Sequence, residues 1–151
     1  MTYQEKKYMA KIIIDANIII SAAFGGKLLE AAVIALNKHS VYLSKEIVQE
    51  LRTVFTRLSK KLTEEQLAAI NKKMDELIAH AKLVEVNESV TLSRDAADDH
   101  YLSLCKTIGS DFLVTGDKDL LCIEQHMLKK EGIDTRIVNP REFLEEQTSL
   151  S

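Results

Sequence analysis

The sequence predicts an α/β protein with a mostly parallel sheet that is covered by helices on both faces. Short runs rich in β-branched residues alternate along the chain with longer segments whose apolar residues recur at helical spacing. The first run, Lys11–Asp15, contains three consecutive isoleucines instead of alternating apolar and polar residues. Such continuous apolar character is typical of a strand buried on both faces of a parallel sheet. Strands that alternate with helices are joined by right-handed crossovers, so the alternation itself indicates the fold class.

The individual elements follow from the same patterns and from helix-capping signals. The predicted strands are Lys11–Asp15, Val41–Leu43, Lys82–Val86, Asp111–Thr115 and Thr135–Val138. The predicted helices are Leu28–Leu36, Lys45–Leu58 after the N-cap Ser44, Glu64–Ile78 after the capping box of Thr63 and Gln66, Asp95–Ile108 before Gly109, Leu120–Lys130, and a last helix that Asn139 and Pro140 open.

The bulk composition fits one soluble domain. With 151 residues, 46% hydrophobic and 28% charged, the chain can bury a sizeable core. We expect residues 1–10 to be a loose segment and residues 11–147 to form a single domain. The most apolar run, Ile12–Ala23, is interrupted by Asp15 and Asn17 and is too short to span a membrane. Cys105 and Cys122 lie among apolar residues, which predicts reduced core cysteines and a cytoplasmic protein.

The charge balance limits how the chain could bind a polyanion. The formal net charge is -3, which does not predict attraction of nucleic acid by a generally basic surface. One local basic patch, made of Arg52, Arg57, Lys60 and Lys61, is interpreted as an ordinary solvated face, with contact to an RNA backbone as the alternative. If the substrate carries phosphates, a bound divalent cation is the obvious group to offset them.

Carboxylates follow two of the predicted strands at the point where each strand ends. Asp15 ends the first strand, and Asp117 and Asp119 follow the fourth. Because parallel strands deliver their carboxyl ends to the same edge of a sheet, these side chains should converge there. Glu50 and Asp98, each near the start of a predicted helix, could join them. Several carboxylates without matching cations repel one another unless Mg²⁺ or Mn²⁺ is bound.

Each carboxylate also has a purely structural interpretation when it is taken alone. Asp98 lies where an acidic residue favours the dipole of a helix, Asp117 can shape a turn, and Glu50 can be solvated. Asp15 is the hardest to explain in this way, because a carboxylate that ends a buried strand is costly without a partner or a metal ion. The argument for a site therefore rests on the joint placement of these residues.

Five segments of the chain resemble the motifs of the PIN domain family, in the family's order. The first is Ile-Ile-Ile-Asp15-Ala-Asn17, the second is Leu43-Ser-Lys-Glu-Ile-Val-Gln-Glu50, and the third is Arg94-Asp-Ala-Ala-Asp98-Asp-His-Tyr-Leu102. The fourth is Leu113-Val-Thr-Gly-Asp117-Lys-Asp119-Leu-Leu121, and the last is Ile137-Val-Asn-Pro-Arg-Glu-Phe-Leu144. Ala16 departs from the family's pattern, because it stands where the family usually has a threonine whose hydroxyl would support the site.

The resemblance implies a three-layer α/β/α sandwich around a parallel five-stranded sheet, and a Mg²⁺- or Mn²⁺-dependent endonuclease that hydrolyses single-stranded RNA. It places the catalytic and metal-binding set on Asp15, Glu50, Asp98 and Asp117. The expected supporting residues are Asn17, Ser44, Thr115, Asp99 and Asp119. The fourth motif is similar to the branch described as toxin components of toxin–antitoxin systems, which implies an antitoxin protein and a homodimer as candidate partners.

Other functions and one assignment stay open at this point. The same fold could bind RNA or protein without cutting, could cleave DNA of a particular structure, or could act on a small phosphate ester. Asp98 and Asp99 are neighbouring candidates for the third-motif ligand. Asp98 fits better because it shares a helical face with Leu102 and Cys105.

Overall fold

The computed structural model describes residues 9–92 and 95–150, and its centre is one parallel sheet. The sheet has five strands in the order β3-β2-β1-β4-β5, and every neighbouring pair is parallel. The strands are β1 (Lys11–Ile14), β2 (Ser40–Leu43), β3 (Lys82–Leu83), β4 (Phe112–Val114) and β5 (Arg136–Val138). The predicted fold class and strand number are confirmed.

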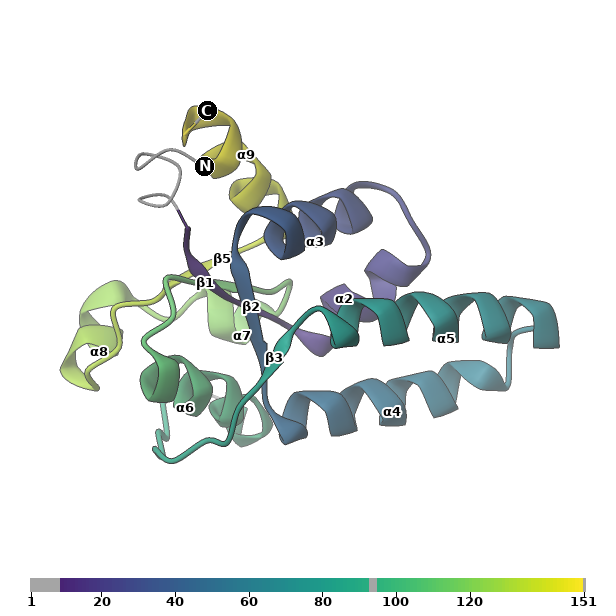
Figure 1. The fold of residues 1–151 in the computed structure, drawn as a ribbon. Helices are drawn as coiled ribbons and strands as arrows, with labels where there is room; N and C mark the ends of the chain where they lie inside the picture. The colour runs from purple at the N-terminus through teal and green to yellow at the C-terminus, as the bar shows by residue number, and fades with distance from the viewer. Residues whose placement is uncertain (1–8, 93–94, 151) are drawn as a thin grey trace.

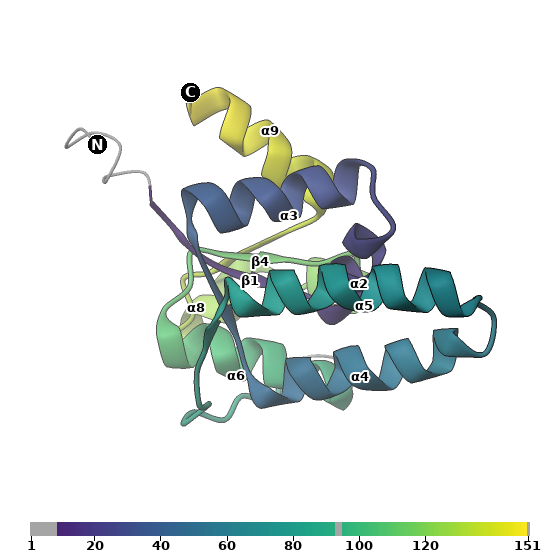
Figure 2. The ribbon, with the colours of Figure 1, turned by 45° about the vertical axis from the view of Figure 1, so that its right-hand side comes forward.

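Helices cover both faces of this sheet. They are α2 (Ala16–Ala23), α3 (Lys27–Lys38), α4 (Lys45–Ser59), α5 (Glu64–Ala79), the 3-10 turn η1 (Ala96–Asp98), α6 (Asp99–Ile108), α7 (Lys118–Leu121), α8 (Gln125–Lys130) and α9 (Pro140–Leu150). Figures 1 and 2 show α3 and α9 packed together on one face and α6 on the other, as in a three-layer sandwich. The long helices α4 and α5 form an antiparallel pair that projects from the side of the sheet.

The centre of the core is β1, which lies between β2 and β4. Its three isoleucines, Ile12, Ile13 and Ile14, are all buried, as the continuous apolar run predicts. The apolar run does not continue as strand, however. Ile18, Ile19 and Ile20 belong to α2, which the sequence analysis did not separate from the strand. Asp15 makes the change of conformation, because its carboxylate accepts a hydrogen bond from Asn17 N and caps the new helix.

The predicted capping signals position the other helices. Ser44 caps α4, and Thr63 with Gln66 forms a complete capping box at α5. Gly109 ends α6 in the left-handed conformation, at φ 64°. Asn139 and Glu142 exchange hydrogen bonds at the start of α9.

Three sequence expectations differ from the structure. The strand predicted to reach Val86 ends at Leu83, and the helix predicted over Leu120–Lys130 is divided into α7 and α8 because the backbone of Glu124 is extended. Cys105 is buried as expected, but Cys122 is exposed at the end of α7.

The predicted loose segment lies outside the described residues except for Met9 and Ala10. Within the described part of the chain, no single helix has the length and apolar character needed to cross a membrane.

Candidate active site

The carboxyl edge of the sheet brings Asp15 and Thr115 side by side. They follow Ile14 and Val114, which are register partners in the neighbouring strands β1 and β4. The Thr115 hydroxyl donates to Asp15 Oδ2 at 2.6 Å and accepts from Asp117 N at 3.0 Å. Thr115 therefore joins the buried carboxylate after β1 to the loop that carries Asp117.

Asp15 is only 4% exposed, and its carboxylate is held by groups from three elements. Besides the Thr115 hydroxyl, it accepts from Asn17 N at 2.9 Å, and the Tyr101 hydroxyl of α6 lies 3.2 Å from Oδ1. The contribution of Asn17 thus comes from its backbone, while its side chain is exposed. These contacts offset the cost of burying the carboxylate where the sequence predicted a partner or a metal ion.

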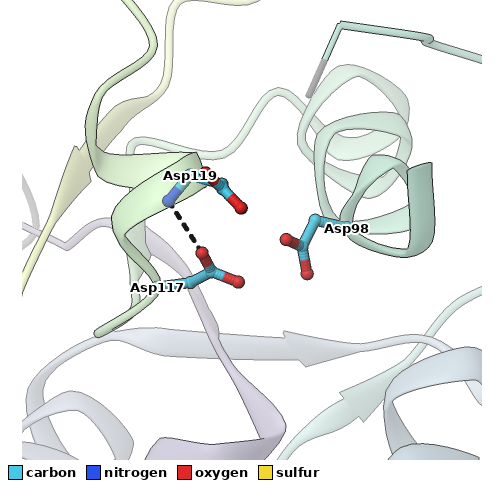
Figure 3. A group of neighbouring side chains, drawn as sticks. All are labelled: Asp98, Asp117 and Asp119. Carbon is cyan, nitrogen blue, oxygen red and sulfur yellow. Dashed lines mark hydrogen bonds between the residues drawn. The ribbon is translucent and has the colours of Figure 1, made fainter. Parts of the chain in front are cut away.

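Asp98, Asp117 and Asp119 form a compact acidic triad beside this edge. Each offers one carboxylate oxygen, and the three oxygens lie within 4.8 Å of one another. Figure 3 shows Asp98, at the start of α6, facing Asp117 and Asp119, which lie at the start of α7. Asp117 Oδ1 also accepts from Asp119 N at 2.8 Å, which orients this short turn.

The electrostatics of the triad are unfavourable without a cation. Burial, the hydrogen bond with Asp117 and the charges of Asp117, Asp95 and Asp15 together raise the pKa of Asp98 to about 7, with burial as the largest cause. One oxygen of Asp98, Oδ2, is buried and has no hydrogen-bond partner among the described residues. Three hard oxygen donors and one unpaired buried oxygen fit Mg²⁺ or Mn²⁺, which prefer carboxylate ligands. Asp98, Asp117 and Asp119 are the residues that would hold such an ion.

Asp99, the neighbouring candidate, lies outside the triad. Its Oδ1 accepts a hydrogen bond from Leu92 N at 3.1 Å, so the side chain fastens the preceding segment to α6. The geometry thus brings Asp98, rather than Asp99, to Asp117. Asp119, expected only as a supporting residue, is a full member of the triad.

Glu50 also lies outside the triad, because both of its oxygens are engaged by α6. His100 Nε2 is 2.5 Å from Oε1, and the Tyr101 hydroxyl is 2.8 Å from Oε2. Burial raises the pKa of Glu50, but the hydrogen bonds from His100 and Tyr101 and the charge of His100 outweigh it, so the pKa is lowered. Ser44 is fully buried and caps α4, which fixes the helix that carries Glu50.

The Tyr101 hydroxyl lies within hydrogen-bond distance of both Glu50 and Asp15, and this role of Tyr101 was not predicted from the sequence. Its side chain is 1% exposed, and its hydroxyl accepts from Ala16 N at 3.0 Å while facing both carboxylates. Burial and the charge of Asp15 raise the pKa of Tyr101 far above its ordinary value, so the hydroxyl keeps its single proton. It donates that proton to one carboxylate at a time. The only sequence signal was a hydroxyl-bearing residue next to the inward-facing Leu102.

A comparison with known protein families identifies the family of this chain. The family model described as PIN domain matches residues 11–119 of the chain. The chain belongs to the PIN domain family. Members of this family are generally nucleases, and they typically use divalent metal ions. No curated protein is similar enough in sequence to match.

Solved structures show the same fold at low sequence identity. PAE2754 from Pyrobaculum aerophilum has a TM-score of 0.61 at 14% identity, covering 93% of this chain and 90% of its own. VapBC2 from Rickettsia felis, bound to a DNA fragment from its promoter, has a TM-score of 0.55 at 11% identity, with coverage of 85% and 98%. A domain of a protein from Methanocaldococcus jannaschii has a TM-score of 0.50 at 17% identity, with coverage of 85% and 90%.

The raised pKa of Asp98 predicts an unusual pH dependence of stability when metal is removed. Between its ordinary value of 3.8 and about 7, Asp98 keeps its proton in the folded state and loses it on unfolding. The folded state then binds more protons, so the free energy of unfolding should fall as pH rises through this range. Urea unfolding in EDTA at a series of pH values measures this slope. Asp98→Asn should flatten it and the exposed-site control Asp134→Asn should not; an unchanged slope in Asp98→Asn would contradict the assignment.

Removing the Tyr101 hydroxyl should destabilise the protein. Tyr101→Phe leaves Ala16 N without its partner in a buried place and leaves Glu50 and Asp15 without a shared donor. We expect a loss of about 1–3 kcal/mol in the free energy of unfolding. Tyr42→Phe, which removes a hydroxyl from β2, is the matched control and should cost much less. Equal effects of the two substitutions in urea unfolding would show that the Tyr101 hydroxyl has no special role.

Proposed function

We propose that this protein is a Mg²⁺- or Mn²⁺-dependent endoribonuclease that hydrolyses phosphodiester bonds of single-stranded RNA. The observation that supports this most is the acidic triad of Asp98, Asp117 and Asp119, with its unpaired buried oxygen on Asp98. It lies at the carboxyl edge of a parallel sheet, where α/β proteins place their ligands. Membership of a family of nucleases agrees with this chemistry.

The proposed site divides its carboxylates into two groups. Asp98 and Asp117, with Asp119, would bind the ion directly. When bound, a divalent ion lowers the pKa of water and neutralises charge on the phosphate. Asp15 orients Thr115 and through it the Asp117 loop. Glu50, held by His100 and Tyr101, is the candidate that completes the metal environment or orients the attacking water.

The cellular role we propose is the toxin of a toxin–antitoxin pair. Two observations support this role. The residues of the fourth motif, Thr115-Gly-Asp117-Lys-Asp119, resemble those of the toxin branch of the family, and the fold is shared with VapBC2. An antitoxin protein would then restrain the nuclease in the cytoplasm, and the active form would be a homodimer, as is common for small symmetric assemblies.

A cleavage panel tests the proposed activity. End-labelled single-stranded RNA, duplex RNA and single-stranded DNA are incubated with Mn²⁺, with Mg²⁺ or with EDTA. We expect cleavage of single-stranded RNA that needs the metal ion, and at least about a hundredfold loss of rate in Asp98→Asn because a ligand is removed. Asp134→Asn, the same chemical change at an exposed position, should keep the activity.

Four outcomes would contradict the proposal. Cleavage in EDTA would remove the metal ion from the reaction, and equal cleavage by Asp98→Asn and Asp134→Asn would indicate a contaminating nuclease. Preferential cutting of DNA would mean that DNA, and not RNA, is the substrate. RNA binding without cleavage under any metal would favour a non-catalytic RNA-binding module.

A further inference from the structure

One flank of α4 carries a row of side chains that starts at the active site. Successive residues of an α-helix are rotated so that residues seven apart lie within about 20° of each other, on the same flank. Glu50 and Arg57 are seven residues apart in α4, and Lys61 follows in the turn that ends the helix, four residues farther on. Glu50, Arg57 and Lys61 therefore form one row, here called the α4 stripe.

The direction of the α4 stripe is fixed by the contacts of Glu50. Its carboxylate is bonded to His100 and Tyr101 of α6, so this flank of α4 faces the active-site side. Arg52, two residues beyond Glu50, points the opposite way and lines the groove between α4 and α5 together with Asn71 and Asp75. In both views, the second half of α4 extends beyond α6 (Figures 1 and 2).

The cations of the α4 stripe are free to bind an anion. Arg57 and Lys61 are exposed, and no ion pair between residues in the described ranges 9–92 and 95–150 involves either of them. No acidic residue occurs in the sequence from Leu51 to Thr63. This local excess of positive charge contrasts with the net charge of -3 and with the acidic triad.

We infer that the α4 stripe binds the phosphates of the RNA strand as it leaves the active site. This inference rests on the proposed function. Arg57 lies about 10 Å along the helix axis from Glu50, and Lys61 about one turn farther. A strand whose scissile phosphate lies at the triad meets repulsion from the carboxylates on either side. Cations placed along one flank of α4 supply the attraction that the site itself lacks, and they favour a path of the strand along this flank.

A phosphate row is a better occupant for this flank than a protein helix. A docked helix needs an apolar stripe, whereas the row beyond Glu50 presents a guanidinium and an ammonium group that match phosphate charge. Four apolar side chains of α4 are half-buried: Val48 and Phe55 line the α5 groove, and Val54 and Leu58, like them, pack against the hydrophobic core, so none of the four adds an exposed apolar stripe to this flank. Charge complementarity and continuity with the active site thus both favour the RNA strand.

Salt-dependent RNA binding tests the α4 stripe. A fluorescent single-stranded RNA is titrated with Asp98→Asn protein in EDTA, which prevents cleavage. Adding Arg57→Gln and Lys61→Gln should weaken binding about tenfold at low salt. The plot of log K against log salt concentration should become shallower by about 1.4, since each lost contact to a single strand contributes about 0.7.

The matched control is the pair Lys45→Gln and Arg52→Gln in the same background. These residues are also seven apart in α4 and carry the same charge, but they lie on the opposite flank. The control pair should change the affinity and the salt slope much less than the stripe pair. Circular dichroism melting verifies that both pairs leave the fold intact.

Equal weakening by the two pairs would mean that net charge alone attracts the RNA, and the inference would be wrong. The inference would also be wrong if RNA did not bind the Asp98→Asn protein at all. It would likewise be wrong if adding Arg57→Gln and Lys61→Gln to the Asp98→Asn protein left RNA binding unchanged, and this result would favour a protein partner as the occupant of the flank. Cleavage is measured in parallel in proteins that retain Asp98. Stripe-dependent binding without cleavage would contradict only the proposed nuclease activity, whereas cleavage with stripe-independent binding would contradict only the α4 stripe.

Discussion

The burial of the Asp15 carboxylate at the end of β1 is the constraint on which the site depends. Hydrogen bonds from Thr115 of the β4 edge and from the backbone of α2 hold this anion, and Tyr101 of α6 lies against it. Each bond that stabilises Asp15 also fixes the element that donates it. The Thr115 hydroxyl reaches on to Asp117, and Tyr101 reaches on to Glu50, so one buried charge aligns both groups of carboxylates.

The parts of the site that follow from strand order could be predicted from the sequence. Asp15 and Asp117 follow runs whose apolar, β-branched residues predict strands, and parallel strands present the residues after them at one edge of the sheet. The helix caps Ser44 and Thr63 could also be predicted from the sequence, because capping depends on local chemistry. The sequence was ambiguous where one apolar run contained two elements, since the isoleucines that follow Asp15 suit a strand as well as a helix.

The remaining features depend on how distant elements pack. Tyr101 and His100 acquire their contacts only because α4 lies against α6, and no local pattern records that pairing. The same packing holds Glu50 outside the triad and leaves Asp119 to complete it. Cys122 was wrongly placed in the core for a similar reason: Leu120 of α7 is buried, but Leu121 and Ile123 on either side of Cys122 are only half-buried, and Cys122 itself, the C-cap of α7, is exposed.

The molecule thus combines an acidic edge, where carboxylates repel one another, with an overall charge that does not attract a polyanion. A calorimetric titration of Mn²⁺ at neutral pH tests this central claim most directly. We expect the wild-type protein to bind Mn²⁺ with release of protons, because Asp98, with a pKa of about 7, must lose its proton to become a ligand. Asp117→Asn should lose this binding, while Asp134→Asn should retain it. Absence of Mn²⁺ binding by the wild-type protein, or equal binding by Asp117→Asn, would contradict the assignment of the triad as a metal site.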